Sequence, residues 1–293
     1  MSTDDAWKLM SGVPETDGQS IGQLNPELLQ SVAHSMSPYA ADLGGADQPD
    51  KPGFDIAGWA DPTDNGHLAG SSNVFAALNT DEEAGTEFTK NAYAAMLAKE
   101  SEYAQDPYAS NAANSLSTAG RLQGLVDKGL LLSTQDEFHD VAEQNKEMYE
   151  RKAAAYGALT AVGGEALGKV PGGSYVNTMI SAGGDPLKEA IIGKEPEPEE
   201  QATLAGPNWN KHYYSILNAT PELPAELVND KEYGWAFDGQ GKLLPWEEAQ
   251  ARIANNIERG GDYDTMFNRL GRHDDGHGTR ITQGYNDVVR NNG

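Results

Sequence analysis

The amino-acid sequence predicts a mainly α-helical protein: a multi-helix N-terminal domain with a Gly/Ala-rich hairpin, followed by a smaller, mostly helical C-terminal region. Two observations carry this prediction. Apolar residues recur at intervals of three and four residues in several segments, which is the spacing of one helix face. Residues that cap or begin helices precede many of these segments, and glycines follow some of them.

The first predicted helix follows Asn25, a good capping residue, and starts at Pro26, which fits the first helical position. Residues 44–72 then combine glycine, proline and aspartate, which predicts a loop. The apolar face of the predicted helix consists of Leu28, Leu29, Val32 and Met36. The side chains expected to hold the loop on the core are Phe54, Ile56, Trp59 and Leu68.

A capping box is expected from Thr80 to Glu83, in which the hydroxyl and the carboxylate each accept a backbone N–H. It would open a helix with one apolar stripe. The stripe consists of Phe88, Ala92, Ala95 and Met96.

A third helix is expected over residues 111–128. Its glycines, Gly120 and Gly124, lie four residues apart and would let a neighbouring helix approach closely. Ser133 or Thr134 is then expected to cap a fourth helix that continues past Ala155.

Residues 153–193 are rich in alanine and glycine and poor in charge, with Pro171-Gly-Gly173 near the centre. This composition predicts a buried helical hairpin, packed on the helix that begins near residue 134. The alternative is a hairpin that enters membranes, but Glu165, Lys169, Asp185 and Lys188 interrupt its two arms.

Alternating proline and glutamate at 194–200 predicts an extended, hydrated linker. The charge also changes there, from a net of −20 in residues 1–200 to −4 in 201–293. The predicted organisation is a flexible lead-in (1–24), a helical domain (25–193), a linker (194–206) and a C-terminal helical region (207–293).

In the C-terminal region, the sequence predicts short helices over 209–227 and an extended segment at 232–237 that enters a turn at 238–241. Pro245 is expected to start an amphipathic helix that ends at Gly260 and Gly261. Another turn or two of helix follows over 263–270.

The net charge of −24 argues against nucleic-acid binding, which needs lysine and arginine to neutralise phosphates, and against anionic membranes. The absence of cysteine excludes disulfides and thiolate metal sites. We find no signal peptide and no apolar run of about 18 residues, so no stable transmembrane anchoring is expected. None of this decides the compartment.

The sharpest polar cluster is His273, Asp274, Asp275 and His277. Two imidazoles four residues apart would share a helix face, where they could bind a metal or do acid–base work. Gly276 disfavours a helix there, and the glutamate that a zinc hydrolase needs after the first histidine is missing. A polar loop is therefore the default interpretation.

Two other patterns are weaker. Residues 61–72 start like a calcium loop, but Ser72 stands where the bidentate glutamate belongs. Asp136, His139, Asp140 and Glu143 would share a helix face, which a solvated acidic surface explains equally well. No phosphate-binding loop or hydrolase elbow occurs, and no cofactor is predicted.

Four short segments carry a resemblance: Ser-Met-Ser-Pro-Tyr at 35–39, Asn-Val-Phe-Ala-Ala-Leu-Asn-Thr-Asp at 73–81, Leu-Gly-Lys-Val-Pro at 167–171, and Asp-Pro-Leu-Lys-Glu-Ala-Ile-Ile-Gly at 185–193. With them, residues 24–200 resemble an uncharacterised helical module of large acidic actinobacterial proteins associated with WXG-type (type VII) secretion and polymorphic toxins. The resemblance implies a secreted or cell-surface protein whose activity, if any, lies elsewhere.

We therefore predict a non-enzymatic helical carrier or interaction module of an exported, toxin-like bacterial protein, with a protein partner. Two hypotheses stay open beside it. One is a toxin enzyme that uses the His/Asp cluster of residues 201–293. The other is a membrane-inserting module that uses residues 153–193.

Overall fold

The computed structural model describes residues 25–45, 65–135, 140–161, 173–196, 206–254, 263–270 and 277–290. Within these ranges the prediction of a mainly α-helical protein is confirmed. They contain no β-strand, and Phe237 and Leu243 form an isolated antiparallel bridge.

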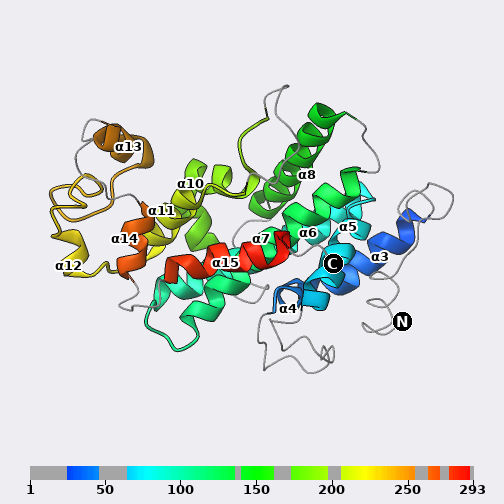
Figure 1. Ribbon diagram of the computed structural model, residues 1–293, viewed down its shortest axis with the longest axis horizontal. Helices are drawn as coiled ribbons and strands as arrows, with labels where there is room; N and C mark the ends of the chain where they lie inside the picture. Colours follow the sequence, from blue (N-terminus) through cyan, green and yellow to red (C-terminus); the bar gives the residue numbers. More distant parts are fainter. Residues whose placement is uncertain are drawn as a thin grey trace.

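The helices in chain order are α3 (Pro26–Met36), α4 (Ala40–Leu43), α5 (Asn65–Leu78), α6 (Glu82–Gln105), α7 (Ala112–Gln135), α8 (Val141–Ala161), α10 (Gly173–Ile192), α11 (Trp209–Ala219), α12 (Ala225–Val228), α13 (Trp246–Ala254), α14 (Tyr263–Leu270) and α15 (His277–Val289), and a 3-10 helix, η1 (Ser37–Tyr39), lies between α3 and α4. In Figure 1, α3 and α4 lie toward one end of the molecule and α12 and α13 toward the other.

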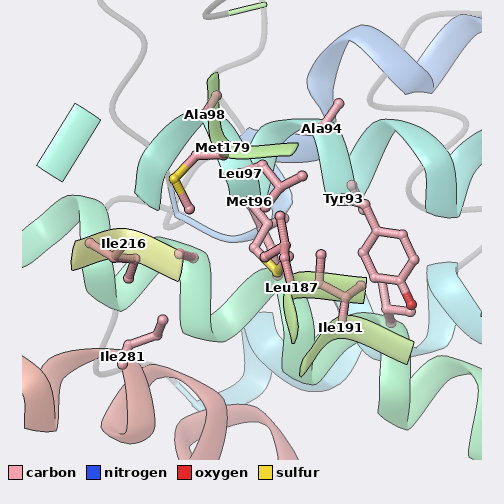
Figure 2. Close-up of a cluster of buried hydrophobic side chains, with 14 of the residues drawn as sticks. Tyr93, Ala94, Met96, Leu97, Ala98, Met179, Leu187, Ile191, Ile216 and Ile281 are labelled. Atoms are coloured by element: carbon pink, nitrogen blue, oxygen red, sulfur yellow. The ribbon is translucent and has the colours of Figure 1, made fainter. Parts of the chain in front are cut away.

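The core forms around α6 and α7, which pack on each other and on most of the remaining helices. Figure 2 shows Tyr93, Met96 and Leu97 of α6 close to Leu187 and Ile191 of α10, with side chains of α11 and α15 nearby. These five side chains are each at most 1% exposed. Such aliphatic and aromatic contacts are the main source of stability in a helical fold of this kind.

Helix α3 begins as predicted, because the Asn25 side chain accepts a hydrogen bond from the backbone N–H of Leu28 at 3.1 Å. The capping box at Thr80 is wrong. The cap of α6 is Asp81, whose carboxylate accepts from the N–H of Ala84 at 2.9 Å, while the Thr80 hydroxyl donates back to the carbonyl of Ala77. The carboxylate also suits the positive end of the helix dipole better than a hydroxyl does.

Two predicted boundaries are wrong for a shared reason. Residues 65–72, expected in a loop, form the first half of α5, and Leu68 and Ser72 are buried there. Ser133 and Thr134, expected as caps, are buried in the last turn of α7, where both hydroxyls donate to the carbonyl of Leu130. Local sequence favoured a break in both places, but burial against neighbouring helices outweighs that preference. Phe54, Ile56 and Trp59 lie outside the described residues.

The close approach predicted at Gly120 and Gly124 is present, and the approaching helix is α15. A Cβ on Gly124 would lie 3.0 Å from the carbonyl oxygen of Tyr285, and one on Gly284 of α15 would lie 2.1 Å from that of Ser117. The two helices therefore meet backbone to backbone, as the ribbon shows for α7 and the red α15 (Figure 1). This is the most extensive contact between any two described helices.

Residues 153–161 are the end of α8 and residues 173–192 are α10, whereas residues 162–172, which include the first two positions of the predicted turn, lie outside the described residues. The first arm is part of the helix on which it was expected to pack, so that detail is wrong. Gly157 is exposed, and a Cβ at this position would meet no atom within 4 Å. Helix α10 bends at Gly184, which has a φ of 52° and precedes Asp185 and Pro186. No described helix is long and apolar enough to span a membrane.

The C-terminal helices are joined by aromatic rings. Tyr263 of α14 stacks on Trp246 of α13 with ring centroids 5.3 Å apart, and it meets Tyr214 and Trp235 edge-on. The predicted turn at 238–241 is present, and Asp238 organises it by accepting hydrogen bonds from the N–H groups of Gln240 and Lys242. These same bonds lower the pKa of Asp238.

The domain boundary at 194–206 stays a prediction, since residues 197–205 are outside the described ranges. Helix α15, from the C-terminal side of that boundary, packs on α7 from the N-terminal side. One continuous cluster of buried apolar residues includes both.

Candidate functional site

A cavity of about 540 Å³ lies where α7, α8, α15 and the end of α10 meet the segment at 206–208. The size falls in the range of small-molecule sites, which is about 300–1,000 Å³. Residues from both sides of the predicted linker line it, among them Asp127, Lys152 and Tyr285.

Asp127 of α7 is the polar centre of the cavity wall and is 4% exposed. Its Oδ2 accepts hydrogen bonds from Gln123 Nε2 at 3.2 Å and from the Tyr285 hydroxyl at 3.1 Å. Its Oδ1 lies 3.2 Å from Nζ of Lys152 in α8. A buried carboxylate without such partners would cost several kcal/mol, so these three donors hold the charge in place.

The electrostatic effect of Asp127 reaches two tyrosines. Burial raises the pKa of Tyr285, and the negative charge of Asp127 and the hydrogen bond to it raise it further. Burial likewise raises the pKa of Tyr93, with Asp127 as a second cause. Tyr285 therefore keeps its proton at neutral pH and acts as a hydrogen-bond donor to Asp127.

The end of α10 and the residues after it also line the cavity. Glu189 carries an ion pair to Lys211 of α11 and lies 3.8 Å from Nζ of Lys194. Gly193 ends α10 with a φ of 82°, and its N–H donates to the carbonyl of Glu189 at 3.0 Å. This left-handed glycine turns the chain along the rim of the cavity, which a residue with a Cβ would do only under strain.

The cavity also has an apolar part. Met148 and Tyr149 of α8 and Ile192 of α10 line it, and Met148 and Ile192 are largely buried. Asn208, whose side chain caps α11 by accepting from the N–H of Lys211, lies at the same cavity. The site thus combines two separate charged groups with an apolar surface between the helices.

A second buried polar pair lies away from this cavity. His212 Nδ1 of α11 and Glu100 Oε1 of α6 are 3.0 Å apart, and both side chains are fully buried. The second carboxylate oxygen of Glu100 and Nε2 of His212 have no hydrogen-bond partner among the described residues. Neither residue lines the cavity. The geometry suits a contact that joins α6 to α11.

Most of the predicted His/Asp cluster precedes α15 in the chain. His273, Asp274 and Asp275 lie outside the described residues, and His277 begins α15 with a side chain that is likewise not described. Among the described residues no group of histidine and carboxylate side chains is arranged to hold a metal ion.

The calcium-loop pattern is wrong in its second half. From Asn65 onward those residues form α5, and the Ser72 hydroxyl donates within the helix to the carbonyl of Leu68. A calcium loop needs these positions in an open turn. In the acidic set near residue 140, Asp140 accepts from the N–H groups of Ala142 and Glu143 at the start of α8. Asp136 and His139 lie outside the described residues.

The sequence analysis did not identify Asp127 or Glu100 as buried polar residues, although the position of each on its helix indicates burial. Asp127 follows Gly120 and Gly124 at seven and three residues, so it extends the face on which a neighbouring helix was expected. Glu100 continues the apolar stripe of Phe88, Ala92 and Met96 by one more step of four. A charged residue on a buried helix face predicts a partner on another element. The partners Lys152, Tyr285 and His212 carry no such signal.

The chain matches no known protein-family model, no curated protein and no solved structure. The resemblance to secretion-associated actinobacterial modules therefore remains a prediction.

Proposed function

We propose that this protein is a non-enzymatic helical interaction module that binds a ligand group in the cavity between α7, α8, α10 and α15. The observation that carries the proposal is the cavity itself, which has the volume of a ligand site and both charged and apolar walls. In the context suggested by its resemblance, the module would belong to an exported, toxin-like bacterial protein with a protein partner.

The hydrogen bonds around Asp127 support binding over catalysis. Three donors hold its carboxylate, and Tyr285 is kept protonated by burial and by that same charge. A general base needs a carboxylate that can accept a proton from the substrate, and a general acid needs a pKa near the working pH. Here the groups hold one another in fixed positions, which suits recognition of a ligand.

The test is a screen of small fragments by ligand-observed NMR, with neutral, anionic and cationic members, on the full chain. We expect a subset to bind. Asn145→Trp places a large ring on the α8 wall of the cavity and should abolish that binding. Lys146→Trp is the matched control, because Lys146 is the next residue on α8, has a side chain 67% exposed and does not line the cavity.

Thermal melting of both variants checks that each still folds. A screen in which no fragment of any charge binds would contradict the proposal. So would binding that Asn145→Trp leaves unchanged, since the fragments would then occupy another place.

A further inference from the structure

We propose that the group bound in this cavity is a carboxylate on a small apolar body, held by Lys152 with Lys194 at the rim. The inference rests on the proposed function and names the ligand class of the same site. Either a small organic acid or the C-terminus of a peptide supplies this chemistry.

The first argument is the charge around the cavity. Among the described residues that line it, the carboxylates are Asp127 and Glu189 and the lysines are Lys152 and Lys194, so their charges balance. Lys211 does not line the cavity, has a side chain 9% exposed and pairs with Glu189. Because Lys211 compensates Glu189 from outside the lining, the two lining lysines are better matched by an anionic ligand than by a cation.

The second argument is the number of donors. An ammonium group offers three N–H donors. Among the described residues, the polar partner of Lys152 is Asp127 Oδ1, so donors remain for a ligand. The Lys152 side chain is 15% exposed and lines the cavity. Lys194 also lines the cavity, is 81% exposed and lies 3.8 Å from Glu189.

The third argument is the hydrogen bonding of Asp127. Because Gln123, Tyr285 and Lys152 already donate to it, its charge is compensated and does not demand a cation from a ligand. On α8, the apolar residues that line the cavity near Lys152 are Met148 and Tyr149. These two side chains can cover an aliphatic or aromatic body attached to the carboxylate.

The experiment compares three probes that share a phenyl group and differ in charge: phenylacetate is anionic, phenylacetamide is neutral and phenethylamine is cationic. Isothermal titration with the full chain should show phenylacetate binding at least about tenfold more tightly than the amide, the effect expected of a hydrogen bond between charged groups. N-acetyl-leucyl-phenylalanine and its C-terminal amide form a second pair. If the acid of this pair binds more tightly than phenylacetate, the source is a peptide C-terminus; the reverse order assigns a free organic acid.

Lys152→Gln should weaken phenylacetate binding by about tenfold or more. Because that variant also removes a partner of Asp127, Lys194→Gln is made beside it at an exposed position, where the fold does not depend on the side chain. It should weaken binding by a smaller factor and flatten its salt dependence. Lys146→Gln, on α8 but away from the cavity, is the control and should change neither.

Equal binding of the three probes, or preference for phenethylamine, would overturn the carboxylate assignment. In that case, fragments that bind the unaltered chain and no longer bind the Asn145→Trp variant would still uphold the proposed function. If no probe and no screened fragment binds, both proposals fail together. Phenylacetate binding that Lys152→Gln and Lys194→Gln both leave unchanged would also overturn the assignment.

Discussion

Gly120 of α7 lies so close to Ile281 of α15 that a Cβ on the glycine would come within 1.9 Å of the Ile281 carbonyl oxygen. The neighbouring atoms belong to the backbone of another helix and cannot rotate away. Gly120→Ala should therefore force α7 and α15 apart and lower the free energy of unfolding by about 1–3 kcal/mol. Urea denaturation monitored by circular dichroism measures this change in the free energy of unfolding.

The control for this change is Gly157→Ala in α8. Gly157 is also helical, but a Cβ there meets nothing within 4 Å. Because alanine is the better helix former, this variant should raise the free energy of unfolding by about 0.5–1 kcal/mol. Equal effects of the two substitutions would contradict the close contact of α7 with α15.

The buried contact of Glu100 with His212 predicts strong coupling. Glu100→Leu leaves the imidazole without its partner, and His212→Leu leaves the carboxylate without its own, so each should destabilise by about 3–5 kcal/mol. The double variant should cost much less than the sum, because it leaves neither group unpaired. A double-mutant cycle in urea measures the coupling, and simple additivity would show that the two side chains do not interact.

The cap of α6 gives a smaller and more local prediction. Asp81→Ala removes the acceptor for the N–H of Ala84 and should destabilise by about 1 kcal/mol. Asp81→Asn keeps an oxygen at that position and should retain most of the stability. Thermal melting distinguishes the two variants, and equal melting temperatures for both would show that the carboxylate does not cap the helix.

Buried tyrosines predict a loss of stability at alkaline pH. Burial, and next the charge of Asp185, raises the pKa of Tyr156 from 10.0 to about 12. Between these values the unfolded chain releases the proton and the folded chain keeps it. The stability present below pH 10 is therefore lost as the pH rises toward 12. Burial also raises the pKa of Tyr103 and Tyr263, so their effect has the same sign.

Urea denaturation at pH 9, 10 and 11 measures this loss, and absorbance near 295 nm follows the ionisation. Tyr156→Phe removes one of the groups and should make the free energy of unfolding fall less steeply over that range. A stability that rises with pH in the same window would contradict the assignment.

The predicted linker can be tested by limited proteolysis, which should cut first within 194–206. Because α15 packs on α7 and shares its core, we expect the two pieces to stay together on gel filtration after the cut. First cuts within residues 80–150 would place the boundary elsewhere.

Local features of the chain were the most predictable from sequence. Asn25 caps α3 because its short side chain reaches an N–H three residues away, and both groups lie in one short stretch of sequence. Tyr263, Met266, Phe267 and Leu270 lie on one helix face and are all buried, since a 3.6-residue period is itself local. The same reasoning misplaced the end of α7 at 128, where burial of Ser133 and Thr134 carries the helix on to Gln135.

By itself the sequence determined the helical class, the Asn25 cap of α3 and the presence of a glycine face on α7, since each depends on residues within about one or two turns. Which helix meets that face was decided by the tertiary structure, which brings α15 across more than 150 residues to Gly120 and Gly124. The cavity was decided in the same way. Asp127, Lys152 and Tyr285 come from three different helices, and packing brings them together around a buried carboxylate, where an unpaired charge is too costly.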